Sequence, residues 1–136
     1  MPIEQEVSSE VYKMMDLHQK FSEGLFEEVN SFISDDFQGM LYMPWNGEVK
    51  QFNSESIREG NRLASQYYKG KDIQFVFTGL NIIPQSTNQA TVSYEVVHQN
   101  KEDFVMVRSL VLEVWRKESD GKWKVIRWYE EKGMHT

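Results

Sequence analysis

The feature that most constrains this fold is a run of four extended segments that fills the chain after Lys71. Each segment is long, rich in β-branched and aromatic residues, and bounded by polar residues. The segments are 72–84, 89–99, 104–118 and 122–132. Short polar connections at 86–88, 100–103 and 119–121 favour hairpins over crossover helices. We therefore predict four consecutive antiparallel strands.

The first half of the chain predicts helices instead. From Val7 to Ile33 apolar residues recur at steps of three and four, which is helical periodicity. The segment Ser22-Glu23-Gly24 interrupts this pattern, so we expect two helices, at about 6–22 and 25–34. The segment 37–45 alternates as a strand that enters a turn at Asn46-Gly47. A capping segment at 53–56 then begins a third helix, which ends at 69–71.

Three helices followed by hairpin-linked strands predict an α+β fold, in which a curved, cone-shaped antiparallel sheet packs against the helices. A length of 136 residues fits one domain, 1–136, with its core at about 8–133. The strands carry apolar residues on both faces, for example Leu110, Val111 and Leu112. Such a sheet needs cover on both sides. Because the helices can cover only one, we predict a homodimer through the outer sheet face.

Charge and composition exclude several classes of function. The net charge of -6 repels phosphate backbones, and the densest basic stretch, 116–124, is interrupted by Glu118 and Asp120, so no nucleic-acid partner is expected. The absence of cysteine excludes disulfides and thiolate chemistry. No signal peptide and no apolar run of some 18 residues is present, which predicts a cytoplasmic protein without a membrane partner. No two histidines have ligand spacing, so we expect no metal and no cofactor.

The order of elements and three local segments resemble the NTF2-like superfamily, especially its SnoaL-like and ketosteroid isomerase-like small bacterial members. The segments are SDDF, P-x-N-G-E-V and the terminal VLEVWRKESDGKWKVIRWYEEKG. The last is also similar to the calmodulin-dependent kinase association domain, and Trp115 and Trp123 predict a cross-strand aromatic pair around its turn. The resemblance spans about 8–133 and implies a cystatin-like roll with a conical cavity. Different members use that cavity for isomerisation, dehydration, cyclisation, ligand binding or oligomer assembly, so function depends on the site.

The resemblance also implies a place for a catalytic base, and this chain departs from it. In the ketosteroid isomerase-like subset a carboxylate base lies just before the proline that ends the first strand. Here Met43 precedes Pro44, and a thioether cannot accept a proton at useful pH. Tyr12 matches the family's tyrosine on the first helix, but without a base it gives little support for that mechanism.

Two other residues are candidate catalytic groups, His18 and Asp36. His18 lies on the apolar face of the first predicted helix, where it acts either as an acid or base in the cavity or as a hydrogen-bonded core residue. Asp36 and its neighbour Asp35 form a carboxylate pair that suits acid-base work or a turn after the helix. The structural role is the favoured interpretation for both. The same reasoning applies to Glu130-Glu131.

Arg108 and several aromatic residues are the candidate ligand-binding groups. Arg108 lies in the middle of an apolar strand, where it binds a ligand carboxylate or pairs with Glu95 on the neighbouring strand. The ion pair is favoured, because it requires nothing beyond the fold. Aromatic rings with polar tips suit the wall of a cavity for a small apolar ligand. The predicted ligand-binding set is Tyr42, Trp45, Tyr94, Arg108 and Tyr129.

Three hypotheses of function follow. The first is a small-molecule-binding protein with a central apolar cavity. The second is a cofactor-independent isomerase, dehydratase or cyclase for a small apolar or polycyclic substrate, with His18 or Asp36 as base and Arg108 or Tyr129 polarising a carbonyl. The third is an oligomeric interaction module that uses the sheet face.

Overall fold

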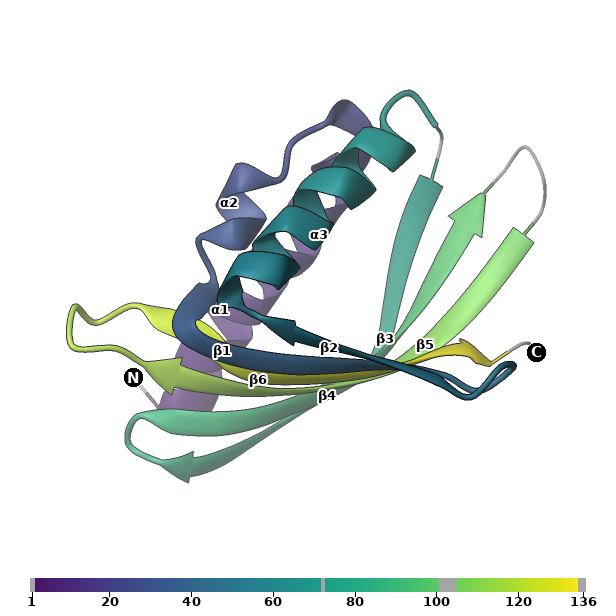
Figure 1. Ribbon diagram of the computed structural model, residues 1–136. Coiled ribbons are helices and arrows are strands. Elements are labelled where there is room, and N and C mark those ends of the chain that lie inside the picture. Colours follow the sequence, from purple (N-terminus) through teal and green to yellow (C-terminus); the bar gives the residue numbers. More distant parts are fainter. Residues whose placement is uncertain (1, 72, 101–104, 135–136) are drawn as a thin grey trace.

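The computed structural model describes residues 2–71, 73–100 and 105–134 and has the predicted α+β architecture (Figure 1). The N-terminal half holds α1 (Ile3–His18), the 3-10 helix η1 (Gln19–Glu23), α2 (Glu27–Asn30), β1 (Ile33–Met43), β2 (Glu48–Asn53) and α3 (Ser54–Tyr68). The rest is β3 (Ile73–Ser86), β4 (Gln89–Asn100), β5 (Val105–Lys117) and β6 (Trp123–Met134). The predicted residues Asp72, Phe104 and His135 lie outside the described part of the chain.

The strands form one six-stranded sheet in the order β2-β1-β6-β5-β4-β3. The pairs from β3 to β6 are antiparallel, as the short turns predict. β1, however, runs parallel to β6, so the sheet is mixed and the expectation of a wholly antiparallel sheet is corrected. No hairpin joins these two strands, and no local sequence signal therefore fixes their relative direction.

Two predicted boundaries move for local reasons. β2 was missed, because its six residues are mostly exposed and show no alternation, although the predicted turn at Asn46-Gly47 does join it to β1. The second predicted helix, 25–34, is shorter in the structure, where it is α2, because β1 already begins at Ile33. The interruption at Gly24 is confirmed: this glycine has a φ of 81° and ends η1.

The cap of α3 is confirmed in detail. The Asn53 side chain accepts a hydrogen bond from the Ser56 backbone N–H at 2.9 Å, and the Asn53 backbone N–H donates to Ser56 Oγ at 2.9 Å. This reciprocal capping box satisfies two backbone donors at the start of the helix.

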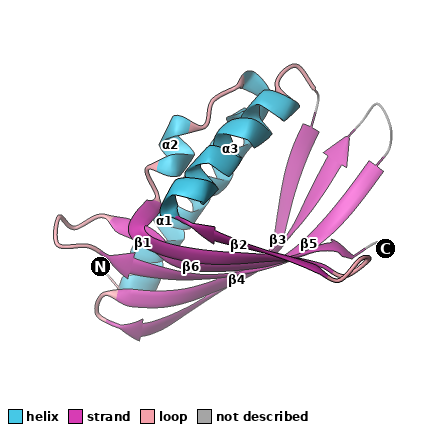
Figure 2. Ribbon diagram, in the orientation of Figure 1, coloured by secondary structure: helices cyan, strands magenta, loops and turns pink. Residues whose placement is uncertain are grey.

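The sheet is strongly curved, and α1 and α3 lie on its concave side (Figure 2). Val7 and Val11 of α1 and Val111 of β5 are fully or almost fully buried in the core between them. Trp115 is also fully buried, and its ring packs edge-on against Phe32 with centroids 5.8 Å apart. The predicted direct pair with Trp123 is wrong, because Trp115 lies opposite Val125 and Trp123 lies opposite Lys117.

Gly39 of β1 lies opposite Trp128 of β6 and leaves room for its ring. A Cβ atom there would lie 2.6 Å from Cε3 of Trp128 and 2.8 Å from Cζ of Phe37, so Gly39→Ala must displace a packed ring. We expect this variant to lose about 1–3 kcal/mol of unfolding free energy, as overpacked cores do. Gly60 is the matched control, because its Cβ would meet nothing nearer than Phe52 at 4.0 Å in the middle of α3.

We expect Gly60→Ala to stabilise the protein by ~0.5–1 kcal/mol. Urea unfolding of both variants measures the contrast. Equal stability of Gly39→Ala and the wild type would contradict the predicted steric conflict.

Candidate functional site

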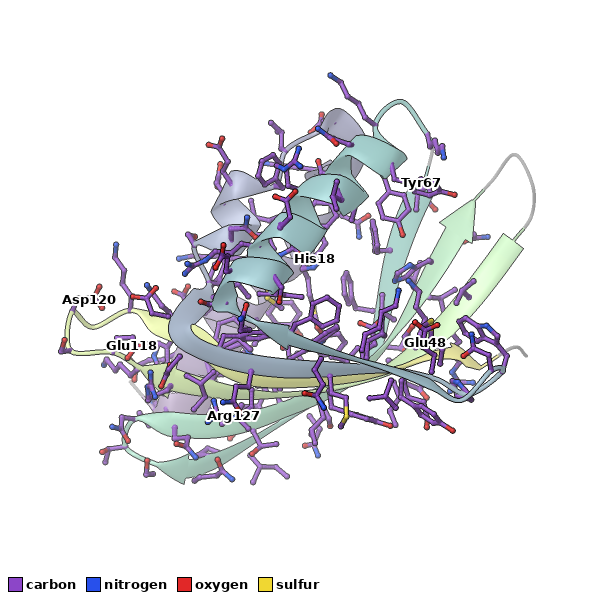
Figure 3. The ribbon with its side chains drawn as sticks, viewed as in Figure 1. His18, Glu48, Tyr67, Glu118, Asp120 and Arg127 are labelled. Atoms are coloured by element: carbon purple, nitrogen blue, oxygen red, sulfur yellow. The ribbon has the colours of Figure 1, made fainter. Side chains whose placement is uncertain are left out.

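A cavity of about 260 Å³ lies between the concave face of the sheet and the helices. Most of its wall is apolar, with aromatic rings that include Phe75, Phe77 and Trp128. The polar or titratable side chains that line it are His18, Asn61, Tyr68, Tyr94, His98, Glu113, Glu130 and Lys132. Figure 3 labels His18 between α3 and the curved ends of β3 to β5. An apolar chamber with a few polar groups is the usual form of a small-molecule site.

Strand register brings the polar groups of the sheet to one face. Tyr94 of β4 lies opposite Val111 of β5, and Val111 lies opposite Glu130 of β6. Glu113 is two residues from Val111, so it points to the same face and lies diagonal to Glu130. Two carboxyl groups from neighbouring strands therefore share the cavity wall.

Glu113 is held by two hydrogen bonds. Its side chain is buried, Tyr94 Oη donates to Oε2 at 3.1 Å, and Trp115 Nε1 donates to Oε1 at 3.0 Å. Burial raises the pKa of Glu113 to about 7, the two hydrogen bonds oppose this rise, and the nearby charge of Glu130 adds to it. Burial also raises the pKa of Tyr94 well above 10, so its hydroxyl stays protonated and acts as the donor. A carboxyl group that titrates near neutrality suits acid-base work or recognition of a charged ligand.

Glu130 and Lys132 lie two residues apart on β6 and both line the cavity. Burial raises the pKa of Glu130, and the positive charge of Lys132 opposes that rise. The same lysine charge, after burial, helps to lower the pKa of His98 to about 4. The cavity therefore contains two acidic groups and one ammonium group.

The two histidines of the cavity are neutral at neutral pH. His18 Nδ1 lies 2.8 Å from the carbonyl oxygen of Met14, which can only accept, so Nδ1 carries the proton and Nε2 is an acceptor. Burial lowers the pKa of His18, as it does that of His98. Phe75 contacts both rings, with centroids 6.1 Å from His18 and 4.8 Å from His98.

Of the residues predicted from sequence, His18 and Tyr94 line the cavity and Asp36 does not. Asp36 lies in β1, and its carboxylate accepts two hydrogen bonds from Arg116 at 2.9 and 3.0 Å. These bonds are the main cause that lowers the pKa of Asp36 to about 2, so Asp36 is ionised throughout the usual pH range. Asp36 therefore lies outside the cavity and has a structural contact, as the favoured interpretation holds, although this contact is an ion pair made from within β1 and not a turn or cap after a helix.

Arg108 also lies outside the cavity. It donates to both carboxylate oxygens of Glu95 at 2.6 Å, which confirms the ion-pair interpretation. Its residue parity on β5 is opposite to that of Val111 and Glu113, so Arg108 lies on the outer face of the sheet. The predicted cavity placement of Arg108 is therefore wrong.

The other three aromatic candidates also lie away from the cavity. Tyr129 lies on the outer face opposite Leu112 and donates to Glu131 at 3.4 Å, and Tyr42 has the outward parity on β1. Trp45 follows β1 in its turn, is 58% exposed, and packs beside Gly133. Tyr12 on α1 is 56% exposed.

Sequence reasoning missed Glu113 as a site residue, although a signal was present. Glu113 is a charged residue between Leu112 and Val114 in an apolar strand, which is the same signal that drew attention to Arg108. Only the register decides that one points inward and the other outward. Among the described residues, no group of three or more histidine or acidic side chains is arranged to hold a metal ion.

No helix in the described part of the chain is both long and apolar enough to cross a membrane. No protein-family model and no curated protein matches the sequence.

Solved structures, in contrast, match the fold over most of the chain. An NTF2-like protein of unknown function from Pseudomonas aeruginosa is 14% identical, with a TM-score of 0.72 over 93% of this chain and 97% of its own. A protein of unknown function with a cystatin-like fold from Nostoc punctiforme is 18% identical, with a TM-score of 0.68 over 93% and 91%. A ketosteroid isomerase-like protein from Erwinia carotovora atroseptica is 20% identical, with a TM-score of 0.57 over 86% and 87%. At these identities the similarity establishes the fold, and the activity has to be argued from the cavity.

Proposed function

Since the chain has the NTF2-like fold, we propose that it binds a small, mostly apolar molecule with one polar group in the cavity between the helices and the sheet. The observation that supports this most is Glu113, a buried carboxyl group oriented by Tyr94 and Trp115 at the wall of an otherwise apolar chamber. Pockets for drug-sized ligands measure roughly 300–1,000 Å³. A cavity of about 260 Å³ favours a smaller ligand with a single ring over the polycyclic substrate considered from sequence.

Ligand binding is tested by filling the cavity. Ala64 lines the cavity on α3, whereas its neighbour Leu63 is 51% exposed, so Ala64→Phe and Leu63→Phe form a matched pair. We expect small cyclic compounds to raise the melting temperature of the wild type and of Leu63→Phe but not of Ala64→Phe. At 100 times Kd the stabilisation is about 2.7 kcal/mol. Equal binding by both variants would place the ligand elsewhere.

A second candidate function is general acid-base catalysis in the same cavity. The pKa of Glu113, about 7, suits a proton transfer next to a carbonyl group, and this residue takes the role that the sequence assigned to His18 or Asp36. A cofactor-independent isomerase would exchange the α-protons of a small ketone. Incubation with cyclohexanone in D2O, followed by NMR, measures that exchange. Loss of exchange in Glu113→Gln supports this function, and an equal rate in the variant contradicts it.

We also propose that two copies of the chain associate through the outer sheet face. Met40 of β1 and Leu110 and Leu112 of β5 point to that face and are 39–44% exposed, with only β6 between the two strands, and large apolar side chains gathered on one exposed face favour a protein interface. Light scattering should show a dimer for the wild type and for Leu63→Glu on α3, and a monomer for Leu112→Glu. A wild-type monomer at micromolar concentration would contradict both the dimer and the interaction-module hypothesis.

A further inference from the structure

We propose that the ligand of this cavity is a protonated amine, in which an ammonium group on a small apolar ring or chain faces Glu113 and Glu130. The inference rests on the proposed ligand-binding function and specifies the head group of the ligand. Three observations support it: the hydrogen-bonding groups that remain free, the sum of the charges, and the aromatic wall.

The groups close to Glu113 offer acceptors to a ligand. Three donors of the cavity are used inside the protein: Tyr94 Oη donates to Glu113, Asn61 Nδ2 donates to Asn30 at 2.8 Å, and His18 Nδ1 donates to Met14. Lys132 and Tyr68, which also line the cavity, are the donors that remain. The carboxyl oxygens of Glu113 and Glu130 have further lone pairs, and His18 Nε2 has no hydrogen-bond partner among the described residues. An ammonium group has three donors and no acceptor, so it matches this inventory.

The charged groups of the cavity also favour a ligand with one positive charge. The titratable groups that face it are His18 from α1, Tyr68 from α3, Tyr94 and His98 from β4, Glu113 from β5, and Glu130 and Lys132 from β6. Burial keeps both histidines neutral, and it raises the pKa of both tyrosines. When both carboxyl groups are ionised, Lys132 balances one of them, and a ligand with one positive charge balances the other.

The rings around the carboxyl groups also favour a cation. Phe77 packs against Tyr94 with centroids 5.6 Å apart, and Trp128 lies opposite Glu113 on the neighbouring strand. The faces of aromatic rings attract cations, most strongly where water is excluded. A carboxylate beside such rings therefore prefers an ammonium group to a neutral hydroxyl of the same size.

The test compares three probes of one shape: benzylamine, benzyl alcohol and benzoate. In calorimetry at pH 7.5 we expect benzylamine to bind at least tenfold more tightly than benzyl alcohol, and benzoate not to bind. Glu113→Gln and Glu130→Gln should each weaken benzylamine binding at least tenfold and change benzyl alcohol binding less than threefold. Glu131→Gln is the matched control, because Glu131 is the next residue and lies on the outer face.

Proton release gives a second readout that does not depend on variants. An ammonium ligand favours the ionised form of Glu113, so binding at pH 6 should release a proton, and the apparent Kd should rise by up to ~tenfold per pH unit below pH 7. Calorimetry in two buffers of different ionisation enthalpy measures this release. Benzyl alcohol binding as tightly as benzylamine overturns the amine inference but leaves the proposed ligand-binding function intact. Failure of all three probes to bind overturns both.

Discussion

Replacing Glu113 with glutamine should produce a change in stability that grows by roughly 3 kcal/mol between pH 4.5 and pH 7. In the folded wild type the pKa of Glu113 is about 7, against 4.5 for the free side chain, and each pKa unit corresponds to ~1.4 kcal/mol. Between these values the folded state retains a proton that the unfolded state has lost, so wild-type stability falls as pH rises. Glutamine does not titrate, and Glu113→Gln should therefore gain stability relative to the wild type over this range.

The stabilities of wild type and variant must be compared at each pH, because His98 changes the stability of the fold with pH in the opposite direction to Glu113. Its pKa is lowered from 6.5 to about 4, so the unfolded state binds the extra proton and stability rises with pH between these values. In the wild type the effects of Glu113 and His98 on the pH dependence of stability partly cancel. The difference between wild type and variant removes the effect of His98, which both proteins share, and leaves that of Glu113. Urea unfolding at pH 5, 6, 7 and 8 measures that difference. A difference that stays constant with pH would show that Glu113 is not a buried acid.

Replacing Trp115 with alanine should cost about 3–5 kcal/mol of unfolding free energy, the largest effect that we expect for a single substitution. The ring is fully buried against Phe32, and its loss leaves a large void and removes the donor to Glu113 Oε1. Trp115→Phe helps to separate the two causes, because its six-membered ring leaves a smaller void than alanine does and still removes the donor. We expect this variant to cost about 1–3 kcal/mol and to raise the pKa of Glu113 further.

The same substitution at an exposed tryptophan is the control for Trp115→Ala. Trp45 is 58% exposed, so Trp45→Ala should cost far less. Chemical unfolding of all three variants, monitored by circular dichroism, gives the comparison. Equal losses for Trp115→Ala and Trp45→Ala would contradict the burial on which the position of Glu113 depends.

These predictions bear on our proposal that Glu113 belongs to a functional site. At neutral pH a buried acid with a raised pKa lowers the stability of the fold, whereas a glutamine of similar size would avoid that loss. A residue that lowers the stability of the folded protein is expected mainly at a functional site. Trp115 and Tyr94 fix the orientation of the carboxyl group, and the cavity gives a small molecule room beside it.

The sequence by itself determined the local elements of this protein. Helical periodicity placed α1, the cap at Asn53 placed α3, and short polar turns placed the hairpins from β3 to β6. These features depend on interactions between residues that are close in the chain, so they can be predicted from local patterns. The break at Gly24 belongs to the same group.

Only the tertiary structure decided the direction of β1 beside β6 and the face of each strand that points inward. The odd-numbered and the even-numbered residues of β5 lie on opposite faces of the sheet, and both sets contain many apolar residues. The sequence of β5 therefore does not show which of the two faces the helices cover. Glu113 and Arg108 therefore look alike in the sequence, although one lies in the cavity and the other pairs with Glu95 outside it. The covering helices lie far away in the chain, and burial depends on what packs against a face as much as on the residues that form it.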